Sequence, residues 1–473
     1  MTERLTAREI LALVADDAGF TELPHPTSDP APDGPLAWQG YDASRARAAE
    51  RTGERESVVV GTAHVTGTPA VLIAFEFGFL GGSLGERTGD RLQAAHEYAR
   101  AHRLPVVPLI ATGGSRMQEG MVALTQLQCV ARQSALTREA GLPQIAVLRD
   151  PTTGGGWATL GAGADVVLAL PGAQVGFAGS RVRPADADPT AYTAEAQVAC
   201  GAADAVVPAT ELRQALGRWL RLLTGGADPA ASPRPAPVPF ALGAQDLPDS
   251  GWEAVRRARS PKRPRARAYL DAYFGHRVAI SGDRCGGADP DGMLCGFGEH
   301  QGRAVAYAAQ TGTATKPSGY RTAARLIRLA DRLGIPVLTL VDTPGAANDA
   351  EAERQGAGAA IAELFGAVAG ARTPVTTLVI GEGGSGGALA LAAPGDTWAT
   401  PDAYFSVIAP EAAAAILKRP DGQAEATADQ LRIRPQDLVE LGVIRGIAGP
   451  PGTCSPVTRK RHKGNHDSTG HRP

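Results

Sequence analysis

The stretch RTPVTTLVIGEGGSGGA, residues 372–388, joins a short apolar run to a cluster of glycines and then to an alanine-containing segment. β-Branched runs bounded by proline and glycine are typical of buried strands. A helix that starts directly after a strand has first-turn amides without intrahelical acceptors, and its dipole adds positive potential there. The stretch therefore predicts a strand, a glycine bend and a helix, with the bend able to stabilise an anionic oxygen.

The same glycines fit other templates. Gly381, Gly383 and Gly386 match G-x-G-x-x-G, but a dinucleotide fingerprint belongs in the first βα unit, with an acid about 20 residues later. Here the match lies in the last third of the chain, and the next acids follow Gly386 too closely. Ser385 matches the G-x-S-x-G elbow, which needs a downstream histidine base, and the only later histidines lie in the tail. Glycines that merely let a helix pack closely against a strand are the remaining alternative.

The pattern of proline, apolar run and glycine bend occurs in both halves of the chain. GLPQIAVLRDPTTGGG, residues 141–156, repeats it in the first half. The interval from Pro105 to Pro143 equals the interval from Pro336 to Pro374. Adding one constant number of residues to position 105 therefore gives Pro336, and adding the same number to position 143 gives Pro374. This constant is called the repeat offset below. Matched intervals of this length predict an internally duplicated chain with one bend in each half.

Apolar runs separated by helix-length segments predict an α/β fold with largely parallel strands. Residues 225–251 are rich in proline, alanine and glycine, and we expect them to link the halves. Residues 449–473 are polar and partly basic, and we expect a disordered tail. Strands are expected over 68–77 and 303–310, and helices over 91–102, 117–140, 320–332 and 352–369.

Composition excludes several classes of protein. The 473 residues carry a net charge of −2, which gives no electrostatic reason to expect nucleic acid or an anionic membrane as partner. Five widely spaced cysteines argue against a zinc ribbon and suggest a reducing compartment. Positions 1–19 are typical of an amphipathic helix and not of a signal peptide, and no apolar run is long enough to span a membrane. A cytoplasmic location is expected.

Long runs of the chain resemble the carboxyltransferase component of acetyl-CoA carboxylase, with a β-like half followed by an α-like half. The β subunit is resembled by residues 74–92, 111–124 and 150–182, and the α subunit by residues 252–274, 319–346 and 379–417. The resemblance implies two tandem crotonase (ClpP-like) domains, over residues 38–224 and 252–448. Residues 1–37 would be an extension without the zinc ribbon that is common in the β subunit, so no metal is predicted.

The resemblance implies a biotin-dependent acyl-CoA carboxyltransferase that converts, for example, acetyl-CoA to malonyl-CoA in fatty acid biosynthesis. Carboxybiotin would arrive on a separate carrier protein, charged by an ATP-dependent biotin carboxylase, and the site would lie at a homodimer interface. Biotin itself would serve as the base, which would explain why no constellation of catalytic acids or histidines is evident. Malonyl-thioester decarboxylation, transcarboxylation, or a non-catalytic role in a carboxylase complex are the alternatives.

The resemblance also implies roles for individual residues. The first bend would bind the thioester oxygen and the second the ureido oxygen of biotin, while neighbouring residues would line the acyl-CoA side. The segment before Arg321 carries fewer basic residues than is usual in the family, which leaves a different substrate open. The expected catalytic residues are Gly154, Gly155, Gly386, Gly387 and Ala388, and the expected substrate-binding residues are Gly113, Gly114, Arg116, Arg321 and Arg354.

Overall fold

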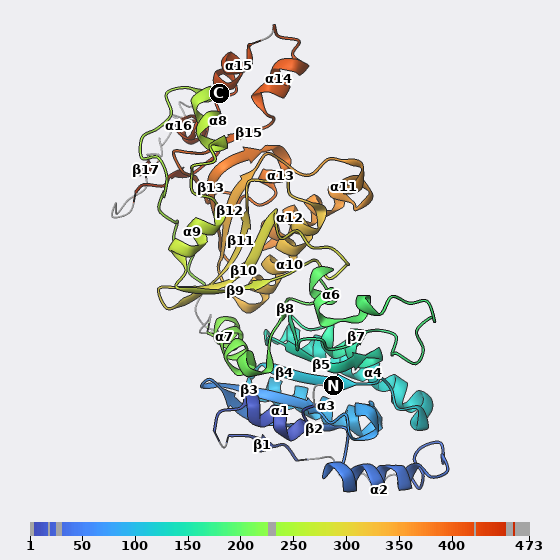
Figure 1. Ribbon diagram of the computed structural model, residues 1–473. Helices are drawn as coiled ribbons and strands as arrows, with labels where there is room; N and C mark the ends of the chain where they lie inside the picture. The colour runs from blue at the N-terminus through green and yellow to red at the C-terminus, as the bar shows by residue number, and fades with distance from the viewer. Residues whose placement is uncertain are drawn as a thin grey trace, which may run out of the picture.

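The computed structural model describes residues 4–17, 19–24, 31–225, 233–420, 422–450 and 457–458. The chain forms two α/β lobes, each built on one sheet, with the N-terminal half below and the C-terminal half above in Figure 1. The predicted α/β class and duplication are confirmed. The predicted disorder of residues 449–473 falls mainly on positions outside the described residues, and it stays a prediction.

The first lobe is built on an eight-stranded sheet within the described ranges and is entered through a short helix. Its helices are α1 (Ala7–Val14), α2 (Tyr41–Thr52), α3 (Glu86–His102), α4 (Gly120–Glu139), α5 (Gly154–Gly156), α6 (Ala194–Ala199) and α7 (Leu212–Thr224). Its strands are β1 (Thr21–Glu22), β2 (Val58–Val65), β3 (Thr68–Phe75), β4 (Val106–Thr112), β5 (Ile145–Thr153), β6 (Val166–Ala169), β7 (Val175–Gly176) and β8 (Ala205–Val206). Short 3-10 turns occur at Leu80–Gly82, Met117–Glu119, Pro189–Tyr192 and Ala209–Glu211, and a π-helical turn at Trp157–Gly161.

The second lobe is built on a nine-stranded sheet, counted over the same described residues. Its helices are α8 (Gly251–Arg259), α9 (Ala266–Tyr273), α10 (Pro317–Leu333), α11 (Ala350–Arg354), α12 (Ala357–Gly370), α13 (Ser385–Leu389), α14 (Pro410–Ile416), α15 (Ala424–Gln430) and α16 (Pro435–Glu440). Its strands are β9 (His276–Ile280), β10 (Met293–His300), β11 (Arg303–Gln310), β12 (Val337–Thr343), β13 (Val375–Gly384), β14 (Thr397–Ala399), β15 (Tyr404–Ser406), β16 (Gly446–Ile447) and β17 (Val457–Thr458).

The two sheets share one topology. The first runs β1-β2-β3-β4-β5-β6-β8 with β7 on the end of β5, and the second runs β9-β10-β11-β12-β13-β14-β16-β17 with β15 on the end of β13. In both, an antiparallel hairpin leads into parallel strands. Parallel strands need helical crossovers, and α3 and α10 supply the equivalent one in each lobe.

The repeat offset extends from the sequence to individual hydrogen bonds. It relates α3 to α10 and β4 to β12 at both ends. In the first lobe the amide of Leu84 donates to Gly114 O at 2.9 Å, and in the second the amide of Thr315 donates to Gly345 O at 3.2 Å. Leu84 and Thr315 also form isolated parallel bridges to the residues that follow these two glycines.

Three expected helices differ from the observed ones. The helices expected from residues 91 and 320 begin earlier, at Glu86 and Pro317, and Pro317 suits a first helical position because its missing N–H would have no partner there. The single helix expected over 352–369 is divided into α11 and α12. Gly356 between them has φ 76°, a left-handed conformation that an α-helix does not accommodate.

Segments outside the two predicted domains also pack on the lobes. The expected N-terminal helix is α1, capped by Thr6 and Glu9, and its Ile10 is fully buried in the core. The linker residues 233–250 form no helix or strand, as expected, yet Ala241 is buried against the second lobe. The amide of Ala241 donates to Gly449 O at 2.8 Å.

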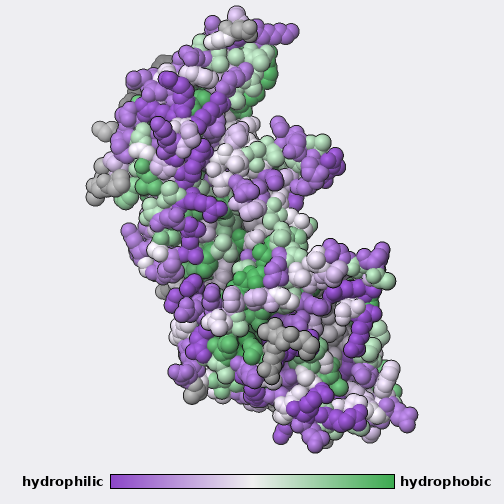
Figure 2. Space-filling view, viewed as in Figure 1, coloured by the Kyte–Doolittle hydropathy of each residue, from purple (hydrophilic) through white to green (hydrophobic). Residues whose placement is uncertain are grey.

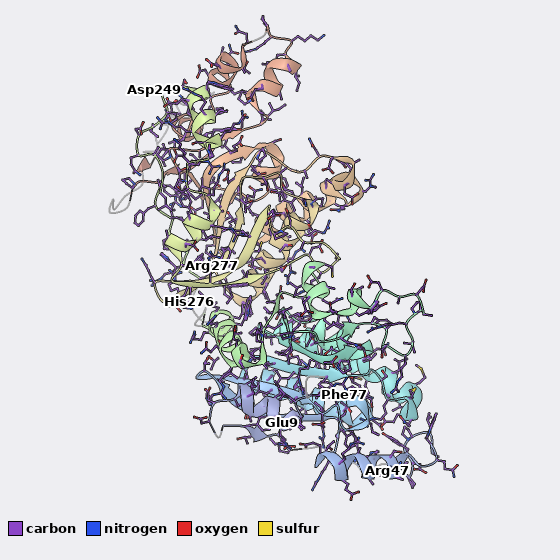
Figure 3. The ribbon with its side chains drawn as sticks, in the orientation of Figure 1. Glu9, Arg47, Phe77, Asp249, His276 and Arg277 are labelled. Carbon is purple, nitrogen blue, oxygen red and sulfur yellow. The ribbon has the colours of Figure 1, made fainter. Side chains whose placement is uncertain are left out.

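One hydrophobic core runs through both lobes. Helix α7 contacts β2 and β3 of its own sheet and β10 and β11 of the second. Trp219 on α7 meets Phe297 on β10 edge to face, with ring centroids 6.1 Å apart. Figure 3 labels His276 and Arg277 on β9, at the side of the second lobe that faces the first, and Figure 2 shows apolar surface where the lobes meet. The lobes are therefore packed together over a shared apolar surface.

The buried His96 makes the stability of the first lobe depend on pH. Its Nδ1 lies 3.0 Å from Thr137 Oγ1 while its buried Nε2 has no partner among the described residues. Burial, and then the positive charges of Arg100 and Arg138, lower the pKa of His96 to about 4. The folded protein thus keeps this imidazole neutral where the unfolded chain, with a pKa near 6.5, binds a proton.

We predict that this difference lowers the free energy of unfolding as the pH falls from about 6.5 to 4, by up to ~1.4 kcal/mol per pH unit. His96→Gln, which can still bond Thr137, should flatten the dependence by about one proton. The measurement is chemical denaturation across that pH range. His102→Gln is the control, because His102 is exposed and stacked on Tyr98. An equal slope in wild type and His96→Gln would contradict the prediction.

Candidate functional site

The first bend lies where β5 passes into α5. Gly154 has φ 62°, and a Cβ atom added to it would lie 3.1 Å from the Cα of Gly114. The loop after β4 and the bend after β5 therefore come together, and the structure brings Gly113, Gly114, Gly154 and Gly155 into one place. This close approach requires glycine at Gly154, because another side chain would be strained in φ as well as crowded.

One expectation for the first bend needs correction. The amide of Gly154 donates to Phe177 O at 3.0 Å, so it is already occupied by the backbone of the β7 segment. The amides that follow, those of Gly155 and Gly156, belong to the first turn of a helix and precede any intrahelical acceptor. The donors that this bend offers are therefore one residue further along the chain than expected.

The second bend lies where β13 passes into α13. The repeat offset places Ser385 on Gly154, and Ser385 has nearly the same conformation, with φ 59°. A non-glycine residue held at positive φ costs on the order of 1 kcal/mol, which indicates that the surrounding structure imposes the bend. Apart from the repeat offset, no signal in the sequence marks the strained Ser385.

The two central glycines of the second bend serve different purposes. A Cβ atom added to the exposed Gly386 would meet nothing within 4 Å, so the approach to this residue is open. A Cβ atom on Gly387 would lie 2.5 Å from both Ala346 N and Tyr320 Oη, so glycine is required there for packing. Ala388 is fully buried, which leaves only its main chain for contact with a ligand.

The loops that precede both bends are held in the same way. The amide of Gly114 donates to Thr112 Oγ1 at 3.1 Å, and the amide of Gly345 donates to Thr343 Oγ1 at 3.2 Å. Gly345, at φ 147°, is the counterpart of Gly114 and was not among the expected site residues. Applying the repeat offset to Gly114 would have identified it.

A buried ion pair supports the second bend from behind. Asp342 is fully buried and accepts from Arg263 Nη2 at 2.5 Å, from Arg265 Nη1 at 3.3 Å and from the amide of Glu382 at 3.1 Å. Glu382 in turn accepts from Tyr404 Oη at 2.9 Å. Asp342 lies near the end of β12 and Glu382 belongs to the bend, so this carboxylate fixes the two loops relative to each other.

Arg116, expected to bind substrate, is instead buried among protein acceptors. Its side chain is 1% exposed and pairs with Glu56 and, at 3.3 Å, with Glu119. It also donates to Tyr41 Oη at 3.2 Å. Burial alone would raise the pKa of Glu56, but the adjacent guanidinium holds that pKa below its usual value. Arg116 fixes the segment after Gly114 and is committed to protein acceptors.

The other two expected arginines lie on helices α10 and α11. Arg321 on α10 pairs with Asp283 at 2.6 Å and donates to Gln355 O at 3.0 Å. Arg354 on α11 forms an exposed pair with Glu351 at 2.9 Å. Both arginines are thus bonded to residues outside the two bends, and their expected role as substrate contacts stays a prediction.

The two bends have separate surroundings within one chain. Within the described residues, the close neighbours of Gly154 and Gly155 all belong to the first lobe, and those of Gly387 all belong to the second. Large apolar side chains are exposed beside both bends. Phe177, 73% exposed, lies beside the first, and Val407, 73% exposed, follows the strand that pairs with the second.

Metal-binding clusters and membrane-spanning helices are both missing from the part of the chain that the structure describes. No group of three or more His, Cys, Asp or Glu side chains there is placed to hold a metal ion. None of the helices in the same residues is long and apolar enough to cross a membrane.

Comparison with known proteins gives matches to both lobes. Residues 37–206 match the family described as "Carboxyl transferase domain", and residues 249–461 match the family described as "Acetyl co-enzyme A carboxylase carboxyltransferase-like". The chain is 40% identical over 473 residues to the acetyl-coenzyme A carboxylase carboxyl transferase subunits beta/alpha of Salinispora arenicola, covering 96% of this chain and 83% of that protein.

Two further proteins extend the comparison. A probable biotin-dependent acyl-coenzyme A carboxylase beta3 subunit of Mycobacterium tuberculosis is 34% identical over 457 residues, covering 94% of this chain and 89% of the relative. The solved structure of transcarboxylase 12S, a hexamer with methylmalonyl-coenzyme A bound, superposes with a TM-score of 0.76. It covers 94% of this chain and 87% of that one, and at 22% identity it indicates the fold alone.

The buried network around Arg116 yields a test of its structural role. We predict that Arg116→Leu destabilises the first lobe by about 3–5 kcal/mol, because Glu56 would remain buried without its partner. The measurement is denaturation followed by circular dichroism. Arg354→Leu is the matched control and should change stability by less than about 1 kcal/mol, since its ion pair is exposed. Equal small effects in both variants would refute the role assigned to Arg116.

Proposed function

Because the chain belongs to the acetyl-CoA carboxylase carboxyltransferase family, in the form with fused β-like and α-like portions, we propose that it moves a carboxyl group from carboxybiotin to an acyl-CoA. The predicted family and the predicted pair of crotonase-like lobes are confirmed. The observation that carries the proposal is the pair of bends, one per lobe, with the same backbone conformation and the same bracing. We assign residues 38–224 to the β-like domain and residues 252–448 to the α-like domain.

Each bend would stabilise one anionic oxygen. In the first lobe the amides of Gly155 and Gly156 would donate to the thioester oxygen of the acyl-CoA as the α-carbon loses its proton. In the second, the amides of Gly386 and Gly387 would donate to the ureido oxygen. Losing one such donor typically costs ~3 kcal/mol in the transition state. Biotin, when bound, supplies the carboxyl group and a ureido group able to take up the proton.

The open side of Gly386 fits a planar group that approaches the backbone. Chain neighbours and its own helix backbone aside, no atom of the described residues stands within 4 Å of where its Cβ would be, which leaves this side of the bend open to a ureido ring. Gly113 has comparable freedom in the first lobe, since a Cβ there would meet only Gly81 O at 3.4 Å. Both bends thus fit a planar group that carries an anionic oxygen, which supports the assignment of one reactant to each lobe.

Association of two copies would bring complementary half-sites together. The exposed apolar side chains beside both bends, Phe177 and Met117 on one lobe and Val407 and Leu389 on the other, favour burial against another surface. A homodimer with the first lobe of one chain against the second lobe of its partner would close the site and exclude water. A biotin carrier protein and an ATP-dependent biotin carboxylase complete the proposed cycle, with fatty acid biosynthesis in the cytoplasm as its setting.

Replacing Gly386 tests the proposed chemistry. We predict that Gly386→Val lowers carboxyl transfer at least ~100-fold, because the branched side chain would occupy the approach to the amides. The exposed Gly366 on α12 also has open space around it, so Gly366→Val is the matched control and should keep its activity. The assay supplies malonyl-CoA and free biotin and follows carboxybiotin and CO2 separately.

Each outcome of this assay has a clear meaning. Carboxybiotin formed by wild type supports the carboxyltransferase. Release of CO2 without carboxybiotin would favour a decarboxylase on the same fold, and no reaction would favour a non-catalytic partner. Near-normal turnover by Gly386→Val would remove the second bend from the mechanism.

Mixing two inactive variants tests whether the site is shared between chains. Gly113→Val should block the first half-site and Gly386→Val the second. If one site combines lobes from two chains, coexpression of both variants should restore about a quarter of wild-type activity, because half the dimers are mixed and each holds one intact site. If both half-sites of one chain form the site, the mixture should remain inactive. Gel filtration of each variant verifies that the assembly is unchanged.

A further inference from the structure

A groove of about 450 Å³ lies between the lobes, apart from both bends. One wall is the face of α10 that carries Arg321, Arg325, Arg328 and Arg332 at the spacing of successive helical turns. The loop before β6 and the 283–285 loop form the opposite wall. Its size is within the range of small-molecule sites.

The groove is far from the first half-site. Gln144, immediately before β5, accepts the amide of Asp165 in the groove wall, whereas the bend follows Thr153 at the other end of the strand. A strand of this length spans roughly 26 Å. A ligand in the groove would therefore not touch the reactants at that bend.

More positively charged than negatively charged side chains line the groove. Arg284 and Arg325 share a single carboxylate, that of the fully buried Asp204, with the bond from Arg325 at 3.0 Å. Asp204 also accepts the amides of Val167 at 2.8 Å and Ser281 at 2.9 Å. Burial, and the positive charge of Arg325, lower the pKa of Arg284 below its usual value.

Two buried donors also lack acceptors. Within the described residues, the Nε atoms of Arg284 and Arg325 are both buried and have no hydrogen-bond partner. A buried charged donor left unsatisfied is costly. Arg332, by contrast, pairs with Asp165 at 2.6 Å and so belongs to the structural contacts between the lobes. The Nη groups do have acceptors, Ala202 O at 2.6 Å for Arg284 and Ser281 O at 3.0 Å for Arg325, so what remains unmet is one Nε donor on each arginine beside a single shared carboxylate.

Arg328 adds a further positive charge closer to solvent. It lies one helical turn after Arg325 on the same face of α10, is 56% exposed and pairs with the surface carboxylate of Glu363. Guanidinium groups bind phosphoryl oxygens through parallel, charge-assisted hydrogen bonds. One anionic group at Arg284 and Arg325 and a second at Arg328 would occupy successive turns of the helix.

We propose that this groove is a binding site for a small anion with two phosphoryl groups, which compensates the surplus charge of Arg284 and Arg325 and contacts Arg328. The ligand would lie beside a contact between the lobes, because Arg284 and Arg325 of the second lobe pair there with Asp204 of the first. The proposal does not depend on the proposed carboxyltransferase function.

Calorimetric titration of the full chain with inorganic pyrophosphate, without substrates and at constant ionic strength, tests this site. Wild type should bind, and Arg325→Gln and Arg328→Gln should bind at least tenfold more weakly. Arg328→Gln alters an exposed residue and guards against loss of folding in Arg325→Gln. Arg372→Gln, at an exposed arginine elsewhere, should bind like wild type. No binding by wild type, or equal binding by all four proteins, would overturn the proposal.

Cys285 gives a second readout, because it is exposed and lines the groove. Pyrophosphate should slow its alkylation by iodoacetamide, followed by peptide mass spectrometry, while the exposed Cys129 on α4 reacts at an unchanged rate. The protection should disappear in Arg325→Gln. Gly113→Val should retain both binding and protection, and their loss in that variant would place the anion at the first half-site instead and refute the proposal.

Discussion

The structure depends on a sharp backbone bend that converts a buried strand into a helix within one residue. Gly154 and Ser385 adopt it with φ values of 62° and 59°. The bend directs the first-turn amides away from the sheet, and those amides have no acceptor in their own helix. The approach of the preceding loop to within 3.1 Å of a Cβ on Gly154 explains the glycine at this place in the first lobe, where the second lobe has Ser385.

The two lobes hold the loops at the bends with the same threonine bonds but place different ion pairs behind them. In the first, Arg116 and Glu56 form a buried pair behind the loop that carries Gly114. In the second, Asp342 joins Arg263 to the amide of Glu382. Buried ion pairs bring little net stability, because desolvation offsets most of the attraction. What they supply is a fixed position for polar atoms, which preorganised donors need if they are to act on a developing charge.

The sequence predicted the features that repeat and missed those that join distant segments. Proline and glycine spacing revealed the duplication because both residues act on the local backbone, and the repeat offset recurs at both ends of β4 and β12. The break at Gly356 was missed because the flanking alanines favour a continuous helix. The burial of Arg116 could not be predicted, since its partners Glu56 and Tyr41 lie far away along the chain.

The charged arginine side chains and the neutral amides of the bends would act on a reactant in different ways. Each of the arginines expected to contact substrate already has a carboxylate partner, and the two bends offer neutral amides in their place. A permanent cation would bind an anionic product or reactant tightly in the ground state, whereas an amide dipole interacts most strongly when charge develops on the oxygen. The surplus positive charge instead lies between the lobes, around Asp204. An anion bound there would act on how the lobes are held together and would leave the half-sites uncharged.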